Sequence, residues 1–260
     1  MNLFDLTKRT AFVSGATHGL GMSIALGLAE AGAKLIISST SEKKLEKALS
    51  QYKILGFDVS GYVLDITNDE MVKKITSEVL NNYKVDILVN NAGIIKRIPA
   101  IEMTPNDFRS VIDVHLTGSF HMSQRFALPM LERRSGKIIN ICSMMSELGR
   151  STVSAYAAAK GGLKMLTKNL ATEWAKYNIQ VNGIGPGYFE TSQTEPIRVD
   201  GHPFNDFIIN RTPAGRWGKT EDLKGTAVFL ASKASDFING QIIYVDGGIL
   251  ATIGKPSNEL

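Results

Sequence analysis

A tyrosine and a lysine that stand four residues apart, Tyr156 and Lys160, are the first candidates for chemistry in this 260-residue sequence. They fall in a stretch of helical periodicity from 153 to 177, and residues four apart on a helix face the same way. A free tyrosine has a pKa of about 10, and a neighbouring ammonium group favours the phenolate and lowers that value. The pair could therefore exchange protons near neutral pH as a general acid and base.

The alternative for this spacing, taken alone, is a solvated helix face. Small residues surround the pair and count against that alternative, because they let a helix approach a cofactor or another helix closely. These residues are Ala155, Ala157, Ala158, Ala159, Gly161 and Gly162.

Three glycines near the N-terminus, Gly15, Gly19 and Gly21, follow an apolar run and lead directly into a helical pattern. Glycines in this context permit a tight turn, close approach of a pyrophosphate and close packing of helix on strand. The helix start would add free N–H groups and a positive dipole end. The segment therefore predicts a dinucleotide phosphate site, and a merely structural tight turn is the alternative.

The elements that must position these residues alternate along the chain. Strands followed by helices of this length indicate βαβ units, and continuously apolar strands indicate a sheet covered on both faces. We therefore predict an α/β fold with a single doubly wound, Rossmann-type, parallel seven-stranded sheet. The expected strands are 10–14, 34–38, 60–64, 86–90, 137–141, 179–184 and 241–245, and the expected helices are 20–31, 41–50, 69–81, 105–133, 153–177 and 221–232.

No repeat or linker divides the chain, so residues 1–260 are expected to form a single domain. One stretch breaks the alternation: residues 190–218 are rich in Pro, Gly, Thr and Asn, with a short apolar piece at 204–209. A segment of this length without regular structure inside a domain is usually functional. We expect a substrate loop at about 190–218, with a plain surface excursion as the alternative.

Composition restricts the class of protein further. The net charge is +4, and the basic residues are spread along the chain, which favours an anionic small molecule over nucleic acid. The single cysteine, Cys142, cannot form an intrachain disulfide, and no Cys/His cluster has the spacing of a metal site. The start is too mixed for a signal peptide, and no apolar run reaches the roughly 18 residues of a membrane helix. A cytoplasmic protein without a membrane segment is expected.

Five ordered motifs resemble those of the short-chain dehydrogenase/reductase family. They are the Gly-x-x-x-Gly-x-Gly turn, Asn90-Asn91-Ala92-Gly93, the set of Ser143 with Tyr156 and Lys160, Pro186-Gly187, and Asp246-Gly247-Gly248. The resemblance implies hydride transfer between a nicotinamide ring and a carbonyl or alcohol, with Tyr156 moving the proton and Ser143 holding the substrate oxygen. It also implies that Lys160 holds the nicotinamide ribose and that the protein is a homotetramer.

The family pattern implies a set of cofactor-binding residues. Asp65, after the third strand, would contact the adenine, and Thr191 would bond the carboxamide. The full set expected at the cofactor is Gly15, Thr17, His18, Gly19, Leu20, Gly21, Ser39, Thr40, Asp65, Asn91, Ala92, Gly93, Tyr156, Lys160, Pro186, Gly187 and Thr191.

One position departs from the family pattern. Family members usually have an asparagine in the helix after the NNAG motif, where it helps to order a water and a helix kink for the proton relay. This chain has His115 at the aligned place. His115 is therefore an additional catalytic candidate, and a satisfied structural histidine is an equal alternative.

The choice between NAD and NADP is expected at the end of the second strand, where an acidic residue would bind the free ribose and repel a 2′-phosphate. This chain has Ser39 and Thr40 there and no carboxylate before Glu42. Hydroxyl groups can bond a phosphate, and Lys43 and Lys44 add positive charge nearby. NADP is the expected cofactor, and use of NAD stays open because no arginine clamp is present.

Within the family, the segments 91–97, 141–150 and 246–254 resemble gluconate 5-dehydrogenases, which interconvert gluconate and 5-keto-gluconate. A sugar acid needs a cation for its carboxylate, and Arg97 and Arg150 flank the expected site; arginine suits bidentate binding of a carboxylate. Glu147 and Gln193 could take sugar hydroxyls. Each of these four residues alone fits a surface position better than a ligand position, and their concentration on loops beside the expected site makes the two alternatives equal.

Three rival functions remain at this point. The first two are reduction of another keto-sugar acid and reduction of a 3-oxoacyl thioester, although an apolar acyl channel would need fewer polar residues than Glu147, Arg150 and Gln193. The third is a catalytically dead cofactor-binding sensor or scaffold, since fold does not fix function. A dead copy should have lost part of the Ser143, Tyr156 and Lys160 set, and all three are present.

Overall fold

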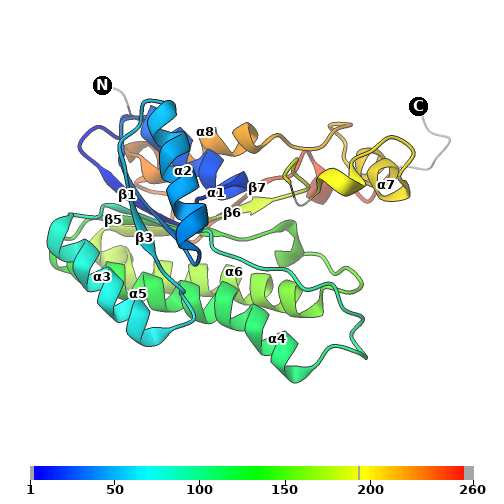
Figure 1. The fold of residues 1–260 in the computed structure, drawn as a ribbon, viewed down its shortest axis with the longest axis horizontal. Coiled ribbons are helices and arrows are strands. Elements are labelled where there is room, and N and C mark those ends of the chain that lie inside the picture. The colour runs from blue at the N-terminus through cyan, green and yellow to red at the C-terminus, as the bar shows by residue number, and fades with distance from the viewer. Residues whose placement is uncertain (1–2, 193, 255–260) are drawn as a thin grey trace.

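The computed structural model describes residues 3–192 and 194–254, and these build a seven-stranded sheet between two layers of helices (Figure 1). Every neighbouring pair of strands is parallel, and the strand order is β3-β2-β1-β4-β5-β6-β7. This confirms the predicted fold class. The strands are β1 (Thr10–Ser14), β2 (Lys34–Ser39), β3 (Val59–Val63), β4 (Ile87–Asn90), β5 (Gly136–Ile141), β6 (Ile179–Pro186) and β7 (Ile242–Val245).

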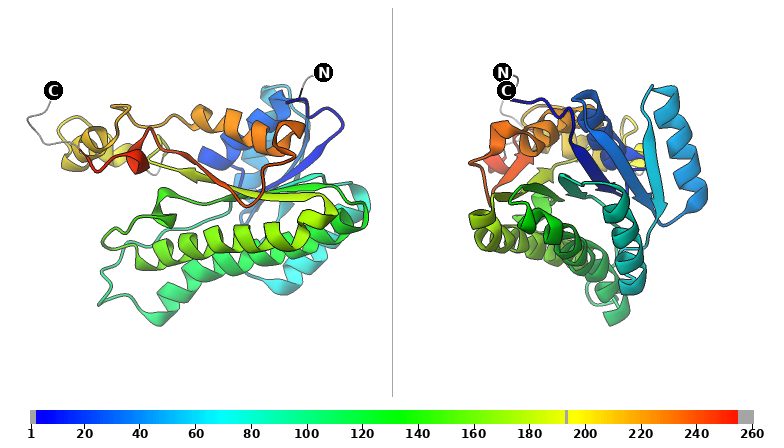
Figure 2. Two further views of the ribbon diagram at one scale, coloured as in Figure 1. Left: turned by 180° about the vertical axis from the view of Figure 1, so that it is seen from behind. Right: turned by 90° about the vertical axis from the view of Figure 1, so that its left-hand side faces the viewer.

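Helices cover both faces of the sheet, as Figures 1 and 2 show. One layer holds α1, α2 and α8, and the other holds α3, α4, α5 and α6, with α7 at one end of the molecule. The helices are α1 (Gly19–Glu30), α2 (Glu42–Ile54), α3 (Asp69–Asn82), α4 (Pro105–Ile112), α5 (Gly118–Glu132), α6 (Ser154–Trp174), α7 (Pro203–Arg211) and α8 (Lys224–Ala231).

Alternate residues of the central strands fill two separate cores. In β1, Val13 packs in the core beneath α1 and α8, while Phe12 packs in the core beneath α3 and α5. In β2, Ile37 packs in the first of these cores and Ile36 in the second. Because successive strand side chains point to opposite faces, a strand covered on both sides must be apolar at every position. This accounts for the continuous apolar runs in the sequence.

The helix starts follow local capping chemistry. Ser41 accepts a hydrogen bond from the backbone N–H of Lys44 at the start of α2, and Asn68 accepts one from Met71 at the start of α3. Thr104 does the same at the start of α4, where a proline occupies the first turn. A side-chain oxygen at this position satisfies a backbone donor that the helix leaves unpaired.

Two features differ from the sequence expectation. The expected helix at 105–133 is interrupted by a π-helical turn, Asp113–Thr117, between α4 and α5. The segment at 190–218, expected to lack regular structure, contains α7, which starts with Pro203 in its first turn and a side-chain cap from His202. Proline, glycine and asparagine made this segment look like a loop, although proline is well tolerated in the first turn of a helix.

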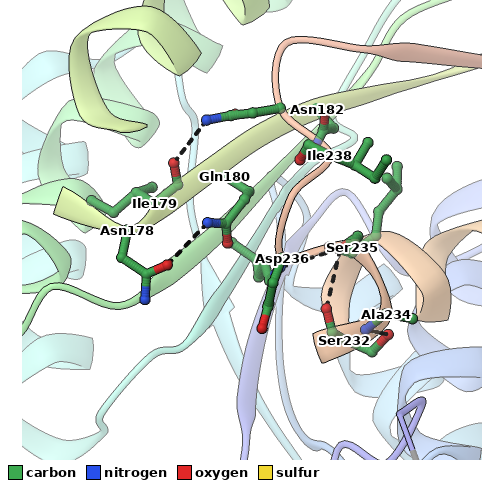
Figure 3. Close-up of polar contacts among 12 residues, drawn as sticks. Asn178, Ile179, Gln180, Asn182, Ser232, Ala234, Ser235, Asp236 and Ile238 are labelled. Carbon is green, nitrogen blue, oxygen red and sulfur yellow. Dashed lines mark hydrogen bonds and ion pairs between the residues drawn. The ribbon is translucent and has the colours of Figure 1, made fainter. Parts of the chain in front are cut away.

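All strands run parallel, so their carboxyl ends lie along one side of the sheet and their amino ends along the other. We call these two sides the carboxyl edge and the amino edge, and they have different roles. In a doubly wound fold, ligands bind outside the carboxyl ends of the strands, at the point where the strand order reverses. Here that point lies between β1 and β4. The opposite, amino edge carries a network of polar side chains that includes Gln180 and Asp236 (Figure 3). Among residues 3–192 and 194–254, no helix is both long and apolar enough to span a membrane.

Candidate active site

The glycine turn after β1 is held directly against the NNAG segment after β4. The Asn91 side-chain amide donates to the carbonyl oxygens of Ser14 and Gly15, at 3.0 and 2.9 Å. Gly15 has a φ of +66°, and a Cβ there would lie 2.9 Å from the Cα of Ala92. A Cβ at Gly21 would lie 2.3 Å from the Asn91 amide nitrogen. These two glycines are therefore required by the close approach of the two segments.

The start of α1 is open for a phosphate group. His18 occupies the N-cap position and, within the described part of the chain, no side chain caps the first turn. Instead, Nδ1 of His18 lies 3.1 Å from the Thr17 hydroxyl oxygen. A Cβ at Gly19 would meet only the Thr191 methyl group, at 3.7 Å. The first turn thus keeps free N–H donors and a positive dipole end, which suits the pyrophosphate of a dinucleotide.

The expected cofactor residues after β2 and β3 lie side by side. Ser39 pairs with Val63 across the two strands, and Asp65 follows two residues later. The Ser39 hydroxyl is buried and accepts a hydrogen bond from the backbone N–H of Ser41 at 3.2 Å, while Thr40 is exposed. The Asp65 carboxylate accepts hydrogen bonds from the backbone and the hydroxyl of Thr67.

The end of β6 is in contact with the end of β7. Pro186 pairs with Val245 of β7, and a Cβ at Gly187 would lie 2.8 Å from the Cα of Asp246. The Pro-Gly and Asp-Gly-Gly motifs are therefore in contact. Thr191, a few residues further along, lies over Gly19 of the glycine turn. The structure thus brings the expected cofactor residues that follow β1, β4 and β6 together at the carboxyl ends of the strands.

Ser143, Tyr156 and Lys160 come together at the carboxyl end of β5. Ser143 caps a short 3₁₀ turn, and a hydrogen bond from it to the Tyr156 phenol lowers the pKa of that group. Lys160 is buried and donates to the carbonyl oxygen of Ile141, with its Nζ 5.5 Å from the centre of the Tyr156 ring. The structure therefore brings these three side chains together at one strand end.

The pKa values of Tyr156 and Lys160 differ from the sequence expectation, in which Lys160 lowers the pKa of Tyr156. Burial raises the pKa of the Tyr156 phenol, and this outweighs the lowering by Ser143 and by the positive charge of Arg97. Burial also lowers the pKa of Lys160 to about 8. The expected lowering of the Tyr156 pKa by Lys160 is thus absent in the free protein, because the ammonium group is directed to Ile141 and desolvation dominates.

His115 lies in the π-helical turn and is fixed by Ile94, just beyond the NNAG motif. Its Nε2 is 2.6 Å from the Ile94 carbonyl oxygen and 3.1 Å from the Ile94 nitrogen. Burial lowers its pKa to about 3, so the ring is neutral at physiological pH. It meets the Tyr156 ring edge-on at 5.2 Å, and a Cβ at Gly93 would lie 2.4 Å from its Cε1. π turns are common at functional sites.

The four expected substrate residues have different surroundings. Arg97 is exposed, its charge acts on the Tyr156 phenol, and it has no hydrogen-bond or ion-pair partner among the described residues. Arg150 is half-buried and in contact with Tyr188 and Phe204. Glu147 binds Lys164 at 2.5 Å and Tyr244 at 2.6 Å, which favours a structural role for it. Gln193 lies outside the described residues.

Tyr188 is not among the residues that the sequence reasoning selected. The charge of an ionised Tyr188 would raise the pKa of the Tyr156 phenol. It stands directly after Pro186-Gly187, and this position at the carboxyl end of β6 was the one signal that could have identified it.

Comparison with known proteins agrees with this geometry. Residues 15–250 match a family model described as enoyl-(acyl carrier protein) reductase. The chain is 59% identical to the 2-dehydro-3-deoxy-D-gluconate 5-dehydrogenase of Formosa agariphila, over 100% of this chain and 99% of the relative. It is 41% identical to the gluconate 5-dehydrogenase of Gluconobacter oxydans, over 97% of this chain and 98% of the relative.

A solved structure shows the same arrangement of elements. The gluconate 5-dehydrogenase of Burkholderia cenocepacia, crystallised with NADP and tartrate, is 43% identical and superposes with a TM-score of 0.92 over 97% of this chain and 99% of that one. The glycine turn, the NNAG segment and the Ser143, Tyr156 and Lys160 set thus occur in a chain that is similar to these proteins along nearly its whole length. The chain therefore belongs to the short-chain dehydrogenase/reductase family of oxidoreductases.

Proposed function

We propose that this protein is an NADP-dependent oxidoreductase that interconverts a six-carbon sugar acid of the gluconate type and its 5-keto form. The observation that carries the proposal is the unpaired cation of Arg97 near the Tyr156 phenol. A carboxylate bound by Arg97 would bring the rest of a sugar acid toward the proton-transferring group. Arginine suits this task because its planar guanidinium can bind a carboxylate through two N–H groups.

The protein's own groups would handle the proton and the substrate oxygen. Ser143 donates to the oxygen of the reacting carbon and holds it beside the Tyr156 hydroxyl. Tyr156 gives up its proton when a ketone is reduced and takes one when an alcohol is oxidised. A bound nicotinamide cofactor supplies or accepts the hydride. Lys160, with a pKa of about 8, would be charged near neutral pH and would bond the nicotinamide ribose.

The cofactor residues fit a dinucleotide. The open first turn of α1, with Gly19 at its start, would hold the pyrophosphate, Gly15 and Gly21 allow the turn to pack against the NNAG segment, and Asp65 would contact the adenine. NADP is proposed as the preferred cofactor because Ser39 and Thr40 offer hydroxyls, and no carboxylate, at the end of β2. The NADP in the Burkholderia cenocepacia structure supports this choice, and use of NAD stays open.

Two substrates compete within the proposed class. Gluconate is favoured by the residues that resemble gluconate 5-dehydrogenases and by the Gluconobacter oxydans relative. The second candidate, 2-dehydro-3-deoxy-D-gluconate, is favoured by the higher identity to the Formosa agariphila relative. Both names place the oxidation at carbon 5 of a gluconate skeleton. Both substrates therefore carry a carboxylate at the other end of their carbon chain, where Arg97 could bind it.

The test is a substrate panel that follows nicotinamide absorbance with both acids and the uncharged amide of each. Arg97→Ala should raise KM for the acids strongly and leave cofactor affinity unchanged, because truncating one partner of a desolvated charge pair costs about 2–5 kcal/mol. The amides should lose far less. Arg109→Ala, which removes an exposed arginine of α4, is the matched control. Equal losses for acid and amide would show that Arg97 is structural.

Assembly and cellular setting form part of the proposal. We infer that residues 1–260 act as one cofactor-binding domain and that 190–218 is the substrate loop, since this segment follows the Pro186-Gly187 motif at the carboxyl end of β6. A homotetramer is supported by the exposed apolar side chains Phe120 and Leu128 of α5 and Met165 of α6. A cytoplasmic setting is supported by the single thiol, Cys142, which is buried with a pKa raised to about 11.

A further inference from the structure

Arg150 is already engaged within the protein. Its guanidinium lies over the Phe204 ring, with Cζ 4.4 Å from the ring centre, and its NH1 donates to the Tyr188 hydroxyl at 3.3 Å. Arginine stacks on aromatic faces in this way through its planar, delocalised charge. Arg97, in contrast, has no such partner among the described residues. The two arginines that flank the site are therefore not equivalent.

The contacts of Arg150 join three separate segments. Arg150 belongs to the loop after β5, Tyr188 to the loop after β6, and Phe204 to the first turn of α7. The rings of Tyr188 and Phe204 meet edge-to-face at 5.7 Å, and Tyr188 meets Trp217 in the same way at 5.7 Å. Pairs of this geometry add stability beyond the area that they bury.

A buried hydrogen bond fixes the base of this aromatic cluster. Trp217 and Asn205 are both about 5% exposed, and the indole N–H of Trp217 donates to the Asn205 side-chain oxygen at 2.8 Å. Asn205 is the neighbour of Phe204 on α7. Helix α7 is therefore attached to the loop after β6 through Tyr188 and Trp217, and to the loop after β5 through Arg150.

Tyr188 keeps a donor for a ligand. Its oxygen accepts a hydrogen bond from Arg150, which leaves the hydroxyl proton for another acceptor, and the residue is only half-buried. The charge of an ionised Tyr188 would also raise the pKa of the Tyr156 phenol. A half-buried hydroxyl at the carboxyl end of β6, oriented by a fixed cation, can distinguish substrates that carry a hydroxyl from those that lack it.

We propose that Tyr188 is a specificity-determining residue that donates a hydrogen bond to a hydroxyl of the sugar acid, and that Arg150 is a positioning residue which orients Tyr188 and attaches α7. This inference rests on the proposed function and changes the sequence expectation for Arg150, which orients Tyr188 in place of binding the substrate carboxylate. The carboxylate is left to Arg97. Because Tyr188 contacts both Arg150 and Phe204 of α7, the residue proposed to recognise the substrate is also one that holds the 190–218 segment in place.

The experiment is a double-mutant cycle on the sugar acid that the substrate panel identifies. Tyr188→Phe should raise KM by about tenfold with little change in kcat, since a neutral hydrogen bond is lost in the ground state and the transition state alike. Arg150→Lys keeps the charge and loses the stack, and it should raise KM for the acid and its amide by the same factor. In the Tyr188→Phe background, Arg150→Lys should add nothing, because both changes remove one interaction.

The proposal would be overturned if the increases in KM from Tyr188→Phe and Arg150→Lys were additive, or if Arg150→Lys raised KM only for the acid. Either result would indicate that Arg150 binds the substrate carboxylate. Phe204→Leu removes the stack while keeping Arg150, and it should reproduce Arg150→Lys. Phe207→Leu changes an exposed ring on the same helix and is the matched control. Its KM should equal that of the wild-type protein.

A second measurement needs no substrate. Arg150→Lys and Phe204→Leu should speed trypsin cleavage after Arg198, Arg211 or Arg216 several-fold, because α7 loses an attachment, whereas Tyr188→Phe should speed it less. Unchanged cleavage would refute the positioning role. If the wild-type protein turned over no sugar acid, the proposed function would fail, and the cleavage rates would still decide whether Arg150 positions α7.

Discussion

The two edges of the sheet both carry charged and polar side chains, but they use them in opposite ways. At the amino edge, Lys137 binds Asp236 at 2.8 Å and the Ser235 hydroxyl at 3.2 Å, beside a polar cavity of about 460 Å³. At the carboxyl edge, Arg97 has no partner in the described chain and no side chain caps α1.

Figure 3 shows how fully the amino edge is internally bonded. Gln180 donates to the Asn178 side chain at 3.2 Å, and the Ser235 hydroxyl donates to the Ser232 carbonyl oxygen at 3.1 Å. Charges that are already neutralised by the protein stabilise the fold, whereas charges left without a partner are free to act on a ligand. Unsatisfied binding capacity therefore identifies the active site better than the size of a cavity does.

The largest expected effect tests the carboxyl edge. Tyr156→Phe should lower kcat by about 10³-fold, because it removes the proton-transferring hydroxyl and little else. NADP affinity and the midpoint of thermal unfolding should be nearly unchanged. Steady-state kinetics and a fluorescence titration of NADPH check both statements. A kcat within tenfold of the wild-type value would show that another group moves the proton.

A change at the amino edge should lower the stability of the fold and have little effect on kcat. Asp86 is buried and accepts from the Thr10 N–H at 3.1 Å, with Arg9 and Lys84 both at 3.5 Å. Asp86→Ala should lower the free energy of unfolding by about 2–3 kcal/mol, because hydrogen bonds to a charged group are lost and a donor is left unpaired. Urea unfolding measures this loss. If Asp86→Ala instead lowered kcat strongly at unchanged stability, the two edges would not differ in role.

His115 shares features of both edges: it is a titratable group at the carboxyl edge whose Nε2 lies against Ile94, while its buried Nδ1 has no hydrogen-bond partner among the described residues. Its pKa is about 3 in the folded protein and 6.5 in an unfolded chain, so between these values the unfolded chain binds more protons and stability falls as pH falls. At pH 5 this group alone should cost about 2 kcal/mol relative to pH 7. His115→Asn should show a smaller decline in urea unfolding. Equal declines would assign the acid sensitivity to other groups.

The smallest expected effect concerns cofactor choice. Ser39→Asp places a carboxylate at the end of β2, and its repulsion of a 2′-phosphate should lower kcat/KM for NADP by about tenfold. The value for NAD should stay the same or rise. Ser50→Asp, on the exposed side of α2, controls for added negative charge. A wild-type protein that strongly prefers NAD would overturn the reading of Ser39 and Thr40.

Much of the fold and part of the site follow from local sequence patterns. β1 agrees with its expected bounds at both ends, and Gly15, Gly21 and Asn91 lie in contact because motifs next to strand ends meet at one edge of a parallel sheet. Helix α7 was missed because its proline and polar residues are equally typical of loops. Local patterns were sufficient where a single element determines the geometry.

The rest depends on contacts between distant segments. The raised pKa of Tyr156 reflects desolvation by the assembled site, which the spacing to Lys160 does not reveal. The stacking of Arg150 on Phe204 joins residues more than fifty positions apart. The same holds for Tyr188, which contacts Phe204 of α7, Trp217 and Arg150, and its immediate neighbours in the sequence encode none of these contacts.

The buried thiol of Cys142 has a practical consequence for following the 190–218 segment in solution. The chain has one cysteine, and burial raises the pKa of its thiol to about 11, so the reactive thiolate is scarce at neutral pH. A cysteine introduced at an exposed position of α7, such as Phe207, would therefore be the one thiol that a maleimide dye labels readily. The native protein could carry a single fluorophore on α7 without any prior removal of cysteines, and the dye would report directly on the attachment of that helix.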